Sequence, residues 1–105
     1  DANAMALQSL ELATTPARIV NATGPEILEV RRLAEEFGRL LGKPVTFEGT
    51  EAPDALLNDA SRTIAQLGPP RVDVDRLLRW TADWISRGGE SLGKPTKFEI
   101  RDGRF

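Results

Sequence analysis

The sequence contains no cysteine, no histidine and no tyrosine. Without cysteine, the chain can form neither a disulfide bond nor a thiolate metal site. Without histidine, it cannot build a Ser-His-Asp triad or a histidine-based zinc site. Without tyrosine, it has no tyrosine acid/base. The side chains left for chemistry are carboxylates, lysines and hydroxyls, and the absence of cysteine favours a cytoplasmic location.

The sequence also lacks long apolar runs and a basic excess. No run approaches the roughly 20 apolar residues of a membrane span, and the first four residues, Asp1-Ala2-Asn3-Ala4, are not the start of a signal peptide. The formal net charge is −2, whereas a nucleic-acid-binding domain normally carries a basic excess. We therefore expect neither a membrane nor a nucleic-acid partner.

The length of 105 residues is enough for one domain. The chain begins with Asp1, and its one methionine is Met5. Since translation starts at methionine, we expect further sequence upstream of this segment.

Four segments have the features of helices. Apolar residues recur at helical spacing after position 30, and Gly42 stands where a C-terminal cap belongs. Asp73 is a suitable N-cap for the helix that follows it, and either Asn58 or Asp59 can cap a shorter helix that runs to Leu67. The remaining helix precedes Thr14-Thr15-Pro16. The three longer helices are predicted over residues 2–13, 30–42 and 74–87.

Short segments between these helices have the features of strands. Arg18–Asn21 and Pro44–Glu48 flank the helix over 30–42, which predicts a βαβ unit with parallel pairing and a right-handed crossover. Lys97–Arg101 alternates like a third strand, and Asp102-Gly103 is a hairpin-turn signal. The sequence therefore predicts a small α/β fold with about four helices and two to three short strands.

One segment matches a phosphate-binding pattern. Gly88-Gly89-Glu90-Ser91-Leu92-Gly93-Lys94 fits G-x-x-x-x-G-K, but the next residue is Pro95 where the motif needs Ser or Thr for magnesium. The segment also follows a helix, whereas a phosphate loop follows a strand. We interpret it as a helix C-terminal cap followed by a loop.

Other candidate features have structural explanations. Arginines cluster over residues 31–39 and 71–87, but glutamates interleave with the first cluster, as on a solvated helix face. Trp80 and Trp84 lie one turn apart, which favours packing over a binding platform. Acidic pairs such as Glu35/Glu36 and Asp73/Asp75 lack the apolar surroundings that raise a carboxylate pKa for acid/base work.

Several segments together resemble the C-terminal part of the NAD-dependent epimerases and dehydratases, which are extended short-chain dehydrogenases. Members carry a short strand, an Asn-x-x-Gly turn and an amphipathic helix, then an "Asp-x-Ser-Lys … Leu-Gly-x-x-Pro" helix and a final helix with a tryptophan. The opening Asp1–Leu7 is similar to the start of a family helix. The other matching segments are Arg18–Glu26 followed by Val30–Ala34, Leu57–Arg62 followed by Leu67-Gly68 and Pro70, and 74–87 with Trp80 and Trp84.

The resemblance implies that residues 1–105 are a single C-terminal substrate-binding region. The family's Gly-rich dinucleotide loop and Tyr-x-x-x-Lys pair lie upstream, so the N-terminal dinucleotide-binding domain is absent from this chain. NAD or NADP would be the cofactor of the parent enzyme, and this chain alone would hold no cofactor, no metal and no catalytic residue. The substrate would be a sugar nucleotide or a related polar small molecule. The acidic stretch Glu48–Glu51 disfavours a diphosphate.

The expected substrate contacts lie at the Asn21–Gly24 turn and in the 49–58 loop, because both follow predicted strand ends, where open α/β sheets bind ligands. The candidate residues are Asn21, Thr23, Gly24, Thr50 and Asn58. Asn21 and Thr23 could instead satisfy backbone groups of a turn. A detached region should also self-associate through the tryptophan-bearing helix or the 97–105 segment. The alternative function is a stand-alone, non-enzymatic α/β protein-interaction module.

Overall fold

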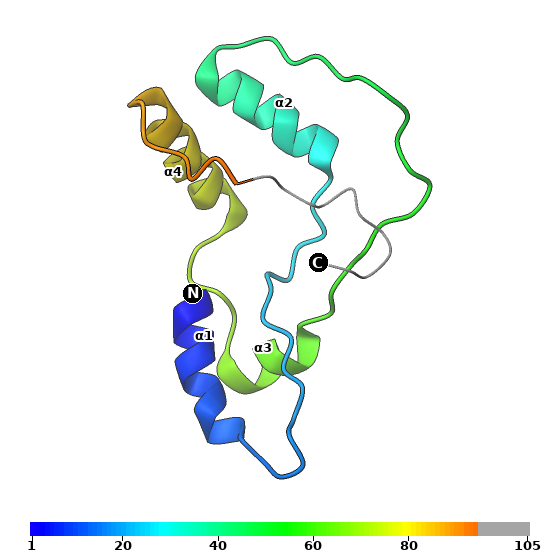
Figure 1. Cartoon of the computed structure of the whole chain (residues 1–105), viewed down its shortest axis with the longest axis vertical. Coiled ribbons are helices and arrows are strands. Elements are labelled where there is room, and N and C mark those ends of the chain that lie inside the picture. The colour runs from blue at the N-terminus through cyan, green and yellow to red at the C-terminus, as the bar shows by residue number, and fades with distance from the viewer. Residues whose placement is uncertain (95–105) are drawn as a thin grey trace.

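The computed structural model describes residues 1–94, and within these residues it contains helices and no strand. Figure 1 shows the arrangement. The elements in chain order are α1 (Ala2–Gln8), the 3-10 helix η1 (Ser9–Leu12), α2 (Val30–Leu41), α3 (Ser61–Leu67) and α4 (Val74–Ser86). The described part of the chain is all-helical, so the predicted α/β class with two to three strands is wrong.

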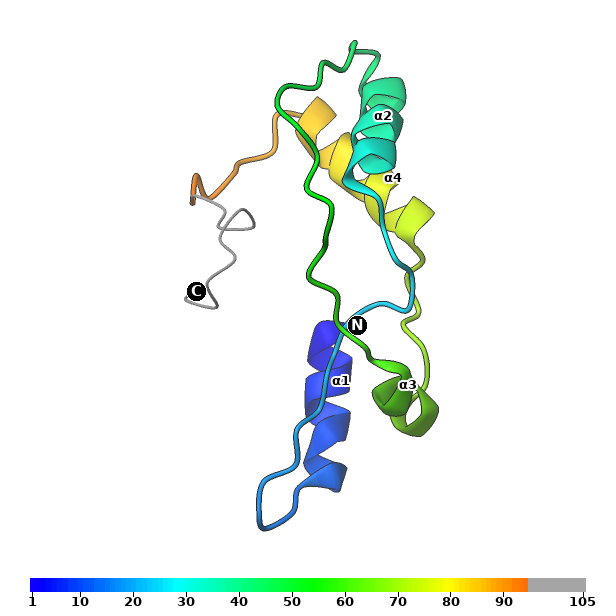
Figure 2. The same ribbon diagram turned by 90° about the vertical axis from the view of Figure 1, so that its right-hand side faces the viewer.

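The helices occupy the two ends of an elongated molecule. α2 packs against α4 at one end, and α1 and α3 lie at the other end (Figures 1 and 2). Two long connections, residues 13–29 and 42–60, run between the ends without helical structure. Within residues 1–94, no helix is long and apolar enough to cross a membrane.

The observed helix boundaries follow local sequence signals. α2 ends at Gly42, which adopts the left-handed conformation (φ 63°), and the Lys43 amide donates to the Gly38 carbonyl at 2.9 Å. α4 begins after Asp73, whose carboxylate accepts a 2.7 Å hydrogen bond from the Arg76 amide. The predicted helices over 30–42 and 74–87 and the predicted Asp73 cap are therefore confirmed. The first helix is shorter than expected, since it tightens into η1 after Gln8.

Residues 18–21 and 44–48, predicted as strands, form no regular secondary structure, so the βαβ unit does not form. Strands need backbone partners, and an isolated pair of such short segments is marginal in water. Side-chain contacts hold these segments instead. The Cζ atom of Arg31 lies 4.1 Å above the centre of the Phe47 ring. Arg18 Nη2 donates a hydrogen bond to Gln66 Oε1 at 2.8 Å. The predicted strand 97–101 and its turn lie outside the described residues.

Very little of the chain is buried. Among residues 1–94, the buried residues are Met5, Ala60, Thr63, Leu78 and Ala82, and none of the larger side chains is fully enclosed. The apolar stripe of α2 is covered only in part, because Leu33, Phe37 and Leu40 are half-buried and Val30 is 75% exposed. The accessible surface is 9418 Å², whereas a compact monomer of 11.5 kDa exposes about 5,800 Å². The chain thus exposes about 3,600 Å² more than a compact protein of its size.

Candidate functional site

Residues 23–28 separate two grooves. One, the α3 groove, has a volume of about 600 Å³ and lies between residues 23–28 and residues 56–64. The other, the α1 groove, has a volume of about 450 Å³ and lies between residues 22–28, the start of α1 and residues 69–77. Thr23, Gly24 and Glu26 line both grooves. These two volumes are the candidate binding sites of the described chain.

The α3 groove brings together two segments that sequence analysis selected separately. Thr23 and Gly24 come from the first predicted contact segment, and Asn58 comes from the second. The two walls are tied by Asn21, whose Nδ2 donates to the Asp59 carbonyl at 3.0 Å. Asn21 thus holds the walls together and lines neither groove. Thr50 is exposed in the connection between α2 and α3, and it also lines neither groove.

Asp59 shapes the same wall through its side chain. Its Oδ1 accepts a 2.8 Å hydrogen bond from the Ser61 amide at the start of α3. This backbone hydrogen bond, together with the Ser61 side chain, lowers the pKa of the Asp59 carboxyl below its ordinary value of 3.8. Asp59 is therefore an ionised acceptor at neutral pH and has no proton to donate to a ligand. Of the two predicted capping residues, Asp59 and not Asn58 accepts the hydrogen bond from the first turn of α3.

The α3 groove combines an apolar floor with acidic edges. Its apolar side chains include Ile27, Leu57 and Ile64, and its charged ones are Glu26 and Asp59. No lysine or arginine lines it. Because like charges repel in a groove that water only partly screens, this lining favours uncharged or cationic groups over phosphates.

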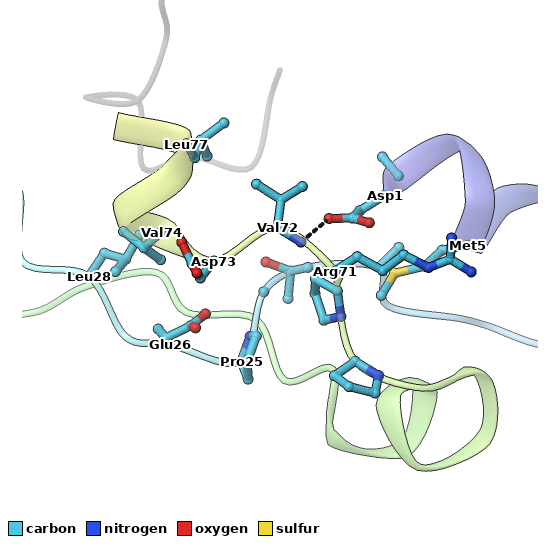
Figure 3. A pocket seen from close by; sticks show the side chains of 16 residues that line it. Asp1, Met5, Pro25, Glu26, Leu28, Arg71, Val72, Asp73, Val74 and Leu77 are labelled. Atoms are coloured by element: carbon cyan, nitrogen blue, oxygen red, sulfur yellow. Dashed lines mark hydrogen bonds between the residues drawn. The ribbon is translucent and has the colours of Figure 1, made fainter. Parts of the chain in front are cut away.

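The α1 groove is more apolar and contains one basic side chain. Met5, Leu28 and Leu77 face it, and Arg71 reaches across toward Met5 (Figure 3). The Asp1 carboxylate closes one side by accepting a 2.9 Å hydrogen bond from the Val72 amide. Its remaining carboxylates, Glu26 and Asp73, leave the lining with more acidic than basic side chains. Residues 69–77 form this wall, and sequence analysis did not predict them as a binding surface.

The segment after α4 is a helix cap, as interpreted from the sequence. The Gly88 amide donates to the Ile85 carbonyl at 3.0 Å, and the Gly89 amide donates to the Trp84 carbonyl at 2.8 Å. Gly88 adopts a positive φ of 71°. These two bonds form a Schellman motif, which satisfies the last carbonyls of the helix. The glycines therefore terminate α4 and do not form a phosphate cradle.

One member of each acidic pair, Glu36 and Asp75, forms an ion pair with an arginine of its own helix. Glu36 bonds Arg39, and this side-chain hydrogen bond lowers the pKa of the Glu36 carboxyl and raises that of the Arg39 guanidinium. Asp75 faces Arg79 at 3.8 Å. Within residues 1–94, no group of three or more acidic side chains is placed to hold a metal ion.

A clamp between α2 and the long connection was not predicted from the sequence. Arg31 Nε and Nη2 both lie 2.7 Å from Glu51 Oε1, and the same guanidinium covers the Phe47 ring. The Arg31–Phe47–Glu51 clamp neutralises part of the acidic stretch 48–51. Spacing along the chain gave no signal for it, because the partners are 16 and 20 residues apart.

The comparisons with known proteins add no identification. No protein-family model, no curated protein and no solved structure matches this chain.

Proposed function

We propose that this chain is the C-terminal substrate-binding region of an NAD(P)-dependent epimerase or dehydratase, and that the chain alone is catalytically inactive. The order of its motifs supports the proposal. The observation that carries it is the α3 groove, where Thr23 and Gly24 of one expected contact segment face Asn58 of the other. The parent enzyme would bind NAD or NADP through its upstream domain, and its location would be the cytoplasm, as a chain without cysteine suggests.

The large exposed surface supports the proposal that this chain is part of a larger protein. An excess of about 3,600 Å² on one chain is more than four times the roughly 800 Å² that one partner contributes to a standard interface. A small ligand or peptide cannot cover such an area. A neighbouring domain can, and the half-buried stripe of α2 is one surface that such a domain would complete.

The groove lining refines the expected substrate. Glu26 and Asp59 face the α3 groove without a basic partner among its lining residues. The groove therefore suits the hydroxyl-bearing, uncharged part of a sugar nucleotide or a related polar substrate. A diphosphate would have to lie outside it, against the proposed upstream domain.

A titration followed by NMR tests the binding role. Amide signals of Thr23, Gly24 and Asn58 should shift when glucose or UDP-glucose is added to the labelled chain, and NAD⁺ should shift none of them. Asn58→Ala should weaken the shifts, whereas Thr50→Ala, at a position outside both grooves, should leave them unchanged. Saturable NAD⁺ binding, or no response to either sugar, would overturn the proposal.

The gene gives an independent test. The reading frame should continue upstream of Asp1 into a Gly-rich dinucleotide loop and a Tyr-x-x-x-Lys pair. A reading frame that starts at Met5 would contradict the enzyme proposal. It would favour instead a helical protein-interaction module, the second candidate, which the exposed Trp80 and Trp84 side chains support.

A further inference from the structure

Residues 18–21 are attached to α3 at two points. Arg18 Nη2 donates to Gln66 Oε1 at 2.8 Å near the end of α3, and Asn21 Nδ2 donates to the Asp59 carbonyl at 3.0 Å just before its start. Because the partner numbers fall from 66 to 59 as the chain advances from 18 to 21, the segment runs antiparallel to the helix. We propose that Arg18 and Asn21 are positioning residues, which dock residues 18–21 along α3 and so set the width of the α3 groove.

The two attachments fit the lengths of the segments that they join. The three steps of chain from Arg18 to Asn21 span at most about 11 Å. The seven steps from Asp59 to Gln66 span about 10 Å, mostly at helical rise. Both hydrogen bonds can therefore form at once, and together they restrict the segment from sliding along the helix or swinging away from it.

The second attachment lies next to both walls of the groove. Thr23 is two residues after Asn21, and Asn58 directly precedes Asp59. With the Asn21 bond in place, Thr23 lies within about 7 Å of chain from an anchor. Without this bond the next anchor upstream is Arg18, and the reach grows to about 18 Å. The Asn21 hydrogen bond therefore restricts how far one wall of the groove can move from the other.

The acceptor of this hydrogen bond is itself held in place. The Asp59 carboxylate accepts a 2.8 Å hydrogen bond from the Ser61 amide, and the Ile64 amide donates to the Ala60 carbonyl at 2.9 Å. Ala60 is also one of the buried residues of the described chain. Asn21 thus binds to a fixed point beside α3, and the bond determines the position of the wall that contains Thr23.

The positioning role follows from where the two donors lie. Neither Arg18 nor Asn21 lines the α3 groove, so they act through residues that do. Within residues 1–94, no other hydrogen bond joins residues 22–28 to residues 56–64. A wall that is already held in place loses less conformational entropy when a ligand binds, and this raises affinity. The inference rests on the proposed function, which supplies the ligand of this groove.

A spin label measures the width of the groove without a ligand. The chain has no cysteine, so Arg62→Cys, at an exposed position in the first turn of α3, carries a nitroxide at one site. In the full 105-residue chain this label should broaden the Thr23 amide signal. Asn21→Ala should reduce the broadening. Asn3→Ala, at an exposed asparagine outside both grooves, is the matched control and should leave it unchanged. Unchanged α2 amide signals confirm that each variant is folded.

An NMR titration with UDP-glucose measures the consequence for binding. Asn21→Ala should raise the dissociation constant about two- to tenfold, the effect of losing one hydrogen bond, while the same amide signals shift at saturation. Arg18→Ala should act in the same direction. Arg18→Lys, which keeps a donor for Gln66, should restore most of the affinity.

The two measurements separate this inference from the proposed function. Equal broadening of the Thr23 signal in the wild-type and Asn21→Ala chains overturns the inference. Reduced broadening with an unchanged dissociation constant also overturns it, because the wall would then move without affecting the site. A wild-type chain that does not respond to UDP-glucose or glucose overturns the proposed function, and the spin-label comparison still decides whether Asn21 positions the wall.

Discussion

At the scale of single residues, Gly89 shows how one missing side chain positions another. The Gly89 amide closes the C-terminal cap of α4, and the residue has no Cβ at the place where the Trp84 indole lies. The indole can then donate to the Glu90 carbonyl. The sequence alone indicated that Gly88-Gly89 ends a helix. It did not indicate that Gly89 also leaves room for the indole, because that requires the direction of the Trp84 side chain.

Gly89→Ala should displace the Trp84 ring. The added methyl overlaps the indole, and relief of such overpacking typically costs about 1–3 kcal/mol. In a Trp80→Phe background, which leaves one tryptophan, the emission should shift to longer wavelength, and the urea midpoint should fall. Gly24→Ala is the control, since its Cβ would meet only the flexible end of Glu26 at 3.3 Å. Unchanged emission in Gly89→Ala would contradict the observed packing.

Asp59 should make the start of α3 sensitive to acid. Its pKa is lowered in the folded chain by the hydrogen bond from the Ser61 amide. The stabilising contribution is therefore present above the unfolded pKa of about 4 and is lost as the pH falls through the lower folded value. The Ser61 amide signal, followed by NMR from pH 6 to pH 2, should titrate with a midpoint below that of an ordinary aspartate. Asp59→Asn should abolish this titration, and a midpoint at or above about 4 would count against the bond.

At the scale of elements, the Arg31–Phe47–Glu51 clamp holds the long connection against α2. An exposed ion pair and an exposed cation–π contact each contribute about 0.2–1 kcal/mol. Arg31→Ala should therefore raise the rate of cleavage by a glutamate-specific protease after Glu48 about three- to tenfold. Arg32→Ala is the matched control, because Arg32 pairs with Glu29 only three residues away. Equal cleavage of both variants would mean that the clamp does not restrain the connection.

The elements also show what sequence reasoning can and cannot reach. The helices were predictable because their signals are local: the Asp73 cap, the left-handed Gly42 and the apolar stripe of α2 are readable within a few residues. The strands 18–21 and 44–48 were not, because alternation describes side chains, whereas a strand exists only through a backbone partner. Of the candidate site residues, Thr23, Gly24 and Asn58 line a groove, Asn21 ties its walls and Thr50 lies elsewhere, and their role in binding stays a prediction.

At the scale of the whole molecule, the main feature is that the buried core is small for a chain of this length. The radius of gyration is 16.8 Å, against about 13 Å for a compact domain of this length. The four buried apolar residues among residues 1–94 offset only part of the conformational entropy lost when the chain is ordered. The proposed parent enzyme would cover a wide area of the exposed surface.

This mismatch predicts a shallow unfolding transition. Unfolding would expose about 7,300 Å² of surface that the folded chain buries, against about 10,900 Å² for a compact chain of the same mass. Because the urea m-value scales with the area exposed, it should be about two thirds of that of a compact protein of 105 residues. The measurement is made at 1–5 μM by circular dichroism. The control is the same chain within the proposed parent enzyme, where α2 should unfold with a steeper transition. A full-sized m-value for the isolated chain would mean that it buries a complete core without a partner, and the case for external cover would be lost.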